Sequence, residues 1–264
     1  MLKNLLFILA FYVSSGATSQ INFMGKPGLM MTPGTTWEED YHLGANFAVI
    51  PWEYSLFENF TELNTTQFYS VRAGFSSFME VNLSIAHRPK MADKIGVGDR
   101  QIDFRFRLLK EKKYQPALVI GLSVPGSTSP VMHHDYLVLS KGFETRYGFF
   151  KANLGYGSPL VVRKLPGKDN FFNSLHLDRK KDLRSGNYLN GFFGGLSYMP
   201  ISFGGLMLEY DTRTWNMGGF LKIRDRFYAH IFNFEASSSW GISFSAQFPL
   251  DIKPKSLRDA KHNN

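Results

Sequence analysis

The 264-residue chain contains no cysteine. This absence excludes disulfide bonds, thiolate metal sites and cysteine nucleophiles, and it also excludes a lipid anchor on an N-terminal cysteine. Long hydrophobic runs are missing as well, because no stretch after Val13 is apolar over the ~18 residues that a membrane-spanning helix requires. The sequence therefore predicts a fold held by neither disulfides nor transmembrane helices.

Acidic residues are fewer than basic ones. The chain has 30 Lys and Arg against 22 Asp and Glu, which gives a formal net charge of +8 and a pI near 9.5. Such a balance favours an acidic partner. Nucleic acid, lipid head groups and anionic polysaccharide all fit the total charge equally well.

The first residues separate these partners. Lys3 is followed by an apolar run from Leu5 to Val13 and by small residues that end at Ser19. This order predicts a secretory signal peptide over residues 1–19 with cleavage near Ser19. An exported chain does not meet nucleic acid in the cytoplasm, so we expect no nucleic-acid partner.

The most frequent pattern in the rest of the chain is alternation of apolar and polar residues. In one example, Ile102, Phe104 and Phe106 alternate with charged residues from Asp103 to Arg107. About 12 such segments of ~8–11 residues occur, the length that a tilted membrane strand needs. They are 40–51, 67–76, 78–88, 100–109, 116–125, 134–142, 149–158, 191–200, 205–211, 217–224, 226–236 and 239–249. We therefore predict an all-β fold, a single antiparallel transmembrane β-barrel of about 12 strands.

The connections between these segments sort by length. The long ones, which include 51–66, 89–99, 126–133 and 159–190, fall mainly on one end of the predicted barrel, and the short ones fall on the other. Bacterial outer-membrane barrels have long outer loops and short periplasmic turns. Aromatic residues at strand ends suit the head-group region, and here they are Tyr41, Phe75, Tyr156, Tyr198, Tyr210, Trp240 and Phe248. We expect a location in the outer membrane, with its lipid and lipopolysaccharide as partners.

The predicted division of the chain has four parts: the signal peptide (1–19), an N-terminal lead-in (20–40), the barrel (41–249) and a periplasmic tail (250–264). The lead-in lacks alternation and is rich in Gly and Pro. A partial plug inside the lumen and a linker are equally good interpretations of it. Residues 159–190 have no clear period, so we expect a long polar loop there.

Charged residues that alternate with the predicted lipid-facing ones would line the lumen. Burying such charges unpaired in a dry core costs several kcal/mol each, which a polar lumen avoids. The lumen-lining candidates are Arg72, Glu80, Asp103, Arg105, Arg107, Lys151, Glu209 and Lys222. Their basic members would give the lumen a positive bias. Loop candidates for contact with anionic glycan or lipopolysaccharide phosphate are Arg163, Lys164, Arg179, Lys180 and Lys181.

Several of these stretches resemble one family. "GLMMTPGTTWEEDYHLGANF", "DRQIDFRFRLLKEKKYQPALVIGL", "HDYLVLSKGF", "LNGFFGGLSYM" and "LMLEYD" are similar to segments of the YjbH family, with matches from about Gly28 to Asp211. The resemblance implies an outer-membrane β-barrel linked to the production and export of exopolysaccharide or capsule. Relatives are often longer, and many carry an N-terminal cysteine that this chain lacks.

The leading functional hypothesis is a passive, porin-like barrel that holds or guides an anionic exopolysaccharide, with other secretion-system proteins as further partners. A structural barrel or an adhesin acting through its outer loops is the alternative. A barrel hydrolase is a third, although no Gly-x-Ser-x-Gly motif is present. We expect no cofactor and no enzymatic activity. His133 and His134 are expected in an outer loop, where neighbouring side chains point apart, so we predict no metal site there.

Overall fold

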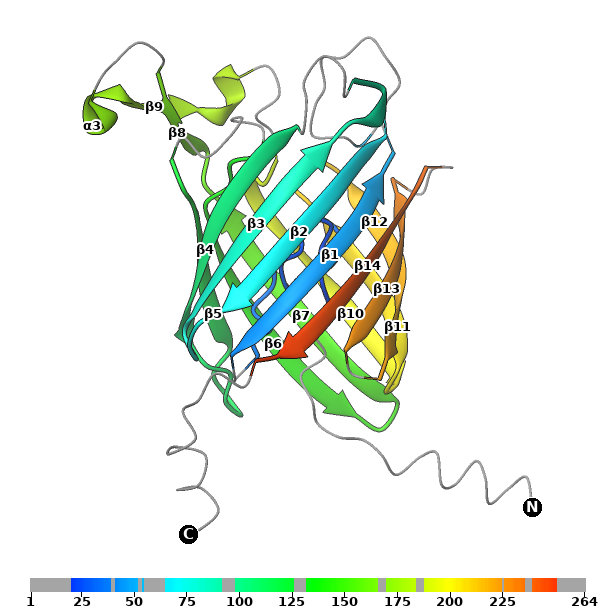
Figure 1. Cartoon of the computed structure of the whole chain (residues 1–264). Coiled ribbons are helices and arrows are strands. Elements are labelled where there is room, and N and C mark those ends of the chain that lie inside the picture. Colours follow the sequence, from blue (N-terminus) through cyan, green and yellow to red (C-terminus); the bar gives the residue numbers. More distant parts are fainter. Residues whose placement is uncertain are drawn as a thin grey trace, which may run out of the picture.

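The computed structural model describes residues 20–38, 41–51, 54, 65–91, 98–125, 132–165, 170–183, 188–224, 226–235 and 239–250. The predicted signal peptide and the tail from residue 251 onward lie outside these ranges. Twelve antiparallel strands close into one barrel, in which each strand pairs with its neighbours along the chain, β7 pairs with β10, and β1 pairs with β14 (Figure 1). The prediction of a single antiparallel barrel of about 12 strands is confirmed.

The barrel strands are β1 (His42–Ile50), β2 (Thr66–Gly74), β3 (Met79–His87), β4 (Asp99–Leu109), β5 (Ala117–Ser123), β6 (Tyr136–Thr145), β7 (Gly148–Gly157), β10 (Gly191–Ile201), β11 (Gly204–Tyr210), β12 (Trp215–Ile223), β13 (Phe227–Phe234) and β14 (Trp240–Pro249). Short turns join them at one end of the barrel, which we call the turn end. The longer connections emerge at the opposite end, which we call the loop end and which is uppermost in Figure 1.

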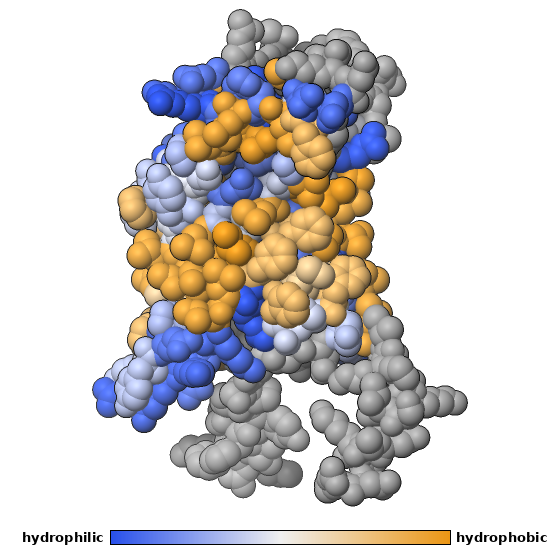
Figure 2. All heavy atoms as spheres, turned by 90° about the vertical axis from the view of Figure 1, so that its left-hand side faces the viewer, coloured by the Kyte–Doolittle hydropathy of each residue, from blue (hydrophilic) through white to orange (hydrophobic). Residues whose placement is uncertain are grey.

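Alternation sorts the side chains between the two faces of the wall. In β4, Gln101, Asp103 and Arg105 are buried, whereas Ile102 between them is exposed. Because successive side chains of a strand point to opposite faces, every strand has one inward and one outward set. Exposed large apolar side chains occur on every barrel strand, and on the face that Figure 2 shows they form a hydrophobic band between hydrophilic ends. The band has the composition of a lipid-facing surface.

The long connection between β7 and β10 contains regular structure, which corrects the prediction of a loop without any. β8 (Leu160–Lys164) and β9 (Leu175–Arg179) form a separate antiparallel sheet, with α3 (Phe171–Ser174) between them and the 3-10 helix η3 (Lys180–Asp182) after them. Each of these strands is only five residues long. A period of two is hard to recognise over so few residues. A second 3-10 helix, η2 (Pro89–Met91), follows β3.

Residues 20–38 lie inside the barrel, where the blue trace of Figure 1 runs between the walls. Every residue from Gln20 to Trp37 is buried. We call this segment the plug. It is irregular apart from two isolated bridges, Ile21 with Pro27 and Gly28 with Pro33. A barrel of this size encloses more space than its own inward side chains fill, and the plug occupies that space.

In the described part of the chain, no helix is both long and apolar enough to cross a membrane.

Candidate functional site

The plug begins with a tight turn that its own sequence specifies. The Asn22 side-chain oxygen accepts hydrogen bonds from the backbone N–H groups of Met24 and Lys26, each at 3.0 Å. Gly25 has a φ of +82°, and a Cβ atom there would lie 2.4 Å from the Cβ of Ser70 on β2. Only glycine meets both demands without strain. The turn holds the plug against the barrel wall.

Lys26 forms a buried ion pair with the wall. Its Nζ lies 2.6 Å from Oδ2 of Asp103 on β4, and both side chains are almost completely buried. Asp103 also accepts hydrogen bonds from the Ser123 hydroxyl at 2.9 Å and from the Gln101 amide at 3.1 Å. A buried pair is tolerated when such additional partners satisfy the remaining lone pairs. Lys26 was not among the predicted site residues, because a single lysine in a Gly/Pro-rich segment gives no periodic signal.

His134 completes this cluster and differs from its predicted place. Its Nε2 contacts the Lys26 ammonium, while its Nδ1 lies 2.5 Å from the carbonyl oxygen of Met132. Burial, and secondly the Lys26 charge, lower the pKa of His134 to about 3, so the imidazole is neutral and accepts from lysine. His133 and His134 precede β6 at the loop end as expected, but both side chains are buried rather than exposed in an outer loop.

Glu209 on β11 binds the backbone of the plug. Its carboxylate accepts hydrogen bonds from three successive N–H groups, those of Met30 at 3.1 Å, Met31 at 2.6 Å and Thr32 at 3.1 Å, and from the Thr32 hydroxyl at 2.8 Å. Successive backbone N–H groups form a concave anion-binding site of the kind that binds phosphate in many proteins. Here the barrel supplies the anion and the plug supplies the nest.

A second charged cluster lies nearer the turn end. Arg105 pairs with Glu80 on β3 and donates a hydrogen bond to the Gly34 carbonyl at 2.8 Å. The guanidinium groups of Arg105 and Arg107 each lie 5.3 Å from the ring centroid of Trp37, a cation–π arrangement. Lys151 on β7 donates to the Thr36 hydroxyl at 2.6 Å. The last residues of the plug are thus held by basic side chains of β4 and β7.

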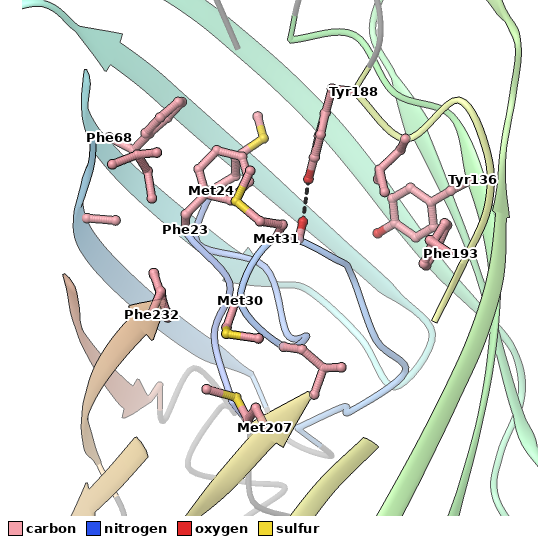
Figure 3. Close-up of a cluster of buried hydrophobic side chains, with 14 of the residues drawn as sticks. Phe23, Met24, Met30, Met31, Phe68, Tyr136, Tyr188, Phe193, Met207 and Phe232 are labelled. Carbon is pink, nitrogen blue, oxygen red and sulfur yellow. Dashed lines mark hydrogen bonds between the residues drawn. The ribbon is translucent and has the colours of Figure 1, made fainter. Parts of the chain in front are cut away.

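The apolar part of the plug packs against the inner face of the barrel and against the connection before β10. The Phe23 ring meets the Phe68 ring edge-on at 4.7 Å and the Tyr188 ring at 5.6 Å. The Tyr188 hydroxyl donates to the Met31 carbonyl at 2.7 Å, which is the dashed line in Figure 3. The same view shows Met30 and Met207 close together below them. The connection that carries Tyr188 therefore covers the plug from the loop end.

The predicted lumen residues all belong to the inner wall but do not line an open lumen. Arg72, Glu80, Asp103, Arg105 and Glu209 are buried, and Arg107, Lys151 and Lys222 are partly buried. Five of them bind the plug and a sixth pairs with Arg105; these are Asp103, Arg105, Arg107, Lys151 and Glu209, and Glu80. The basic side chains that were predicted to give a water-filled lumen a positive charge therefore hold a segment of the same chain.

The predicted loop residues divide into exposed and buried members. Lys164, Arg179 and Lys181 are exposed, and Arg163 forms an ion pair with Asp178. Lys180 differs from the prediction, because it is fully buried and donates to the carbonyls of Tyr188 at 3.1 Å and Leu189 at 3.3 Å. Burial lowers the pKa of Lys180 to about 8. Its role is to fix the connection that carries Tyr188, so it offers no surface to a glycan.

The interior contains no assembled hydrolytic triad within the described ranges. His230 Nδ1 lies 3.0 Å from the Ser243 hydroxyl, but no carboxylate of the described residues contacts this imidazole. Ser123 donates directly to Asp103 with no imidazole between them. A nucleophilic serine needs a base that is itself oriented by a third group. No group of three or more metal-binding side chains occurs among the residues described.

Comparison with known proteins gives one family. The YjbH family model, described as exopolysaccharide biosynthesis protein YbjH, matches residues 20–251. No curated protein matches the chain. Among solved structures, the outer membrane protein Omp33 of Acinetobacter baumannii is similar, with 9% sequence identity and a TM-score of 0.36 over 80% of this chain and 98% of that one.

Proposed function

The chain belongs to the YjbH family of exopolysaccharide biosynthesis proteins, and from this premise we propose that it is a bacterial outer-membrane barrel acting in exopolysaccharide or capsule biosynthesis or export. The exposed apolar side chains on every barrel strand, which form a hydrophobic band on the face in Figure 2, support the membrane placement. The test is whether the protein fractionates with outer membranes and migrates differently on a gel before and after heating. A chain found in the soluble fraction would overturn the placement.

The proposed mechanism starts from a closed barrel whose plug is displaced by an anionic glycan. One observation carries it: the plug is held by charged groups, among them Lys26 with Asp103 and Arg105 with the Gly34 carbonyl. A sugar carboxylate can take the place of the Gly34 carbonyl at Arg105 and add a charge-assisted hydrogen bond there. Lys26 leaves with the plug, so its pairing with Asp103 opposes the exchange and keeps the barrel closed when no glycan is present.

Single-channel conductance in planar bilayers tests this mechanism. We expect an acidic oligosaccharide such as oligogalacturonate to induce ion-conducting steps, and a neutral oligosaccharide of equal length to leave the barrel closed. Arg105→Glu with Arg107→Glu should abolish this response. Arg100→Glu, an exposed position of the same strand, is the matched control and should behave as the unaltered chain. An equal response from all variants would contradict the lumen mechanism.

The alternative, a non-transporting barrel that acts through its outer loops, is favoured by the filling of the interior with residues 20–38. It predicts no conductance in any variant, with or without glycan. It also predicts that removing residues 159–190 alone abolishes the contribution of the protein to surface polysaccharide. If Arg105→Glu with Arg107→Glu abolished that contribution while the loop deletion did not, the transporting function would be preferred.

A further inference from the structure

The β8–β9 hairpin has two chemically different faces. Its antiparallel register pairs Leu160 with Arg179, Val162 with Leu177, and Lys164 with Leu175. Directly opposed residues of an antiparallel pair point to the same side of the sheet. One face therefore consists of Leu160, Val162, Lys164, Leu175, Leu177 and Arg179, and we call it the hairpin apolar face. The other carries Val161, Arg163, His176 and Asp178.

Charge divides between the faces in the same way. On the second face, Asp178 pairs with Arg163 and lies 3.3 Å from Nε2 of His176, so acid and base are balanced there. The hairpin apolar face has four aliphatic residues with a basic residue towards each end, Lys164 and Arg179, and no carboxylate. Apolar side chains flanked by basic ones suit a membrane surface, where hydrocarbon lies beneath a layer of anionic head groups.

The aliphatic side chains of the hairpin apolar face are unusually exposed to solvent. Leu177 is 58% exposed and Leu160 is 38% exposed, and the neighbouring helix α3 adds Phe172 at 78%. On the second face, Val161 is 1% exposed and the His176 side chain is 55% exposed, so only part of that face is covered by the protein. Exposed apolar side chains gathered on one side of a short sheet indicate an interaction surface.

The hairpin stands beside the upper limit of the hydrophobic band. β8 begins three residues after Gly157, the last residue of β7, and the exposed aromatic rings of Tyr156 on β7 and Phe192 on β10 meet at 5.0 Å just below it. Figure 1 shows β8, β9 and α3 projecting sideways beyond the barrel at the loop end. Figure 2, viewed from that side, shows a smaller hydrophobic patch above the main band with hydrophilic residues around it.

We propose that the hairpin apolar face docks on the surrounding lipid leaflet, with Leu160, Val162 and Leu177 against the boundary of the acyl chains and Lys164 and Arg179 on the lipid phosphates. The proposal rests on the outer-membrane placement above and is independent of the glycan mechanism. The occupant is the phosphate-bearing lipid of the outer leaflet, for which lipid A is the source. Docking would hold the connection that carries Lys180 and Tyr188, because η3 directly follows β9.

The absence of cysteine allows a clean test by single-cysteine labelling. Leu177→Cys and His176→Cys place a fluorophore on opposite faces of the same strand, and Leu154→Cys places one on the outward face of β7, where Leu154 is 58% exposed. The full chain is reconstituted in vesicles of phosphatidylcholine with lipid A, of phosphatidylcholine with phosphatidylglycerol, and of phosphatidylcholine alone. A lipid carrying a nitroxide near its head group quenches only fluorophores in contact with the leaflet.

We expect strong quenching at position 177, weak quenching at 176 and strong quenching at 154 in vesicles that contain lipid A. Lys164→Gln and Arg179→Gln should each lower the ratio of docked to undocked hairpins about fivefold, which corresponds to about 1 kcal/mol per basic residue at an anionic surface. Lys112→Gln and Lys113→Gln, exposed residues at the turn end, are the matched controls and should change nothing. Phosphatidylglycerol acting as well as lipid A would assign the contact to lipid phosphate in general.

Equal quenching at positions 176 and 177, with position 154 quenched, would overturn docking while leaving the membrane placement intact. An unquenched label at 154 would instead contradict the placement itself. A label at 177 that is shielded from a water-soluble quencher but untouched by the lipid nitroxide would assign the face to a protein partner and overturn the proposal.

Discussion

Two parts of the barrel wall hold the plug by different means. We call the part that contains β4, β7 and β11 the charged half and the part that contains β12, β13 and β14 the uncharged half. On β4, β7 and β11, charged side chains such as Asp103, Arg105 and Glu209 make directional contacts with it. On β12, β13 and β14, the only lysine, arginine or carboxylate is Lys222, and the inward positions include Phe220, Phe232 and Ser243. Here the glycine at 218 leaves room for Met30.

This difference shows how an irregular segment acquires one position. Packing alone is non-directional and tolerates sliding, whereas a carboxylate that accepts three successive N–H groups fixes both register and orientation. The uncharged half then limits the volume available. Substitutions in the charged half should therefore release or shift the plug, whereas substitutions in the uncharged half should strain it in place.

The largest effect is expected for Glu209→Ala. The change leaves three backbone N–H groups of the plug without their acceptor, at about 1–3 kcal/mol for each buried group that water cannot reach. In a Met31→Cys background, reaction with a membrane-impermeant maleimide should rise by about two orders of magnitude. Glu235→Ala is the matched control, because this exposed glutamate accepts a hydrogen bond from the Tyr54 hydroxyl, and it should leave the rate unchanged. A slow rate in both variants would show that Glu209 does not anchor the plug.

Lys26→Met should follow in size. It leaves Asp103 as a buried carboxylate without its cation, which costs about 3–5 kcal/mol in the free energy of unfolding. Adding Asp103→Asn should recover much of this loss, because Ser123 and Gln101 can still bind the amide. Urea unfolding in lipid vesicles measures Lys26→Met, Asp103→Asn and the double variant. Additive losses would indicate that the two residues do not interact.

Gly218→Ala probes the uncharged half. A Cβ atom at 218 would lie 2.5 Å from the Ile231 carbonyl oxygen and 2.7 Å from Sδ of Met30, so we expect destabilisation of about 1–3 kcal/mol. Gly219→Ala is a close control, because the nearest atoms there are 3.6–4.0 Å away. Its unfolding free energy should change by no more than about 0.5 kcal/mol. The comparison between the halves fails if Gly218→Ala exposes the plug as fully as Glu209→Ala does.

The smallest effect is expected for Tyr188→Phe, which removes one neutral hydrogen bond to the Met31 carbonyl while keeping the ring contact with Phe23. The expected loss is about 1 kcal/mol. The Tyr198 hydroxyl donates to the Tyr147 carbonyl at an exposed site, so Tyr198→Phe should lower the free energy of unfolding by less. Equal losses by thermal unfolding would mean that the loop-end contact does not stabilise the plug.

The barrel could be predicted because its outer face is predominantly apolar, but the contents of its lumen could not. The segment 226–236 shows the limit: alternation there is unclear because the inward residues Tyr228, Phe232 and Phe234 are themselves apolar. They lie in an interior filled by protein, whereas a water-filled lumen would have selected polar residues. The glycines and prolines of residues 20–38 suit a linker as well as a plug. The two are distinguished only by the contacts of this segment with the inward side chains of the barrel.

Single charged residues were harder to place from the sequence where the structure buries a side chain that ordinarily prefers solvent. Lys180 lies in a basic stretch that is typical of a solvated loop, yet its ammonium is satisfied by two carbonyls inside the protein. Asp103 and Arg105 could be assigned to the inner face from periodicity. Their partners Lys26 and Gly34 could not, since those contacts join segments far apart in the sequence.

The most direct test of the account is the conductance of the barrel with and without residues 20–38, measured in planar bilayers after gel migration confirms that both proteins are folded. The intact barrel should show no ion-conducting steps, and the shortened one should conduct steadily. Equal conductance from the two proteins would contradict the claim that this segment closes the lumen.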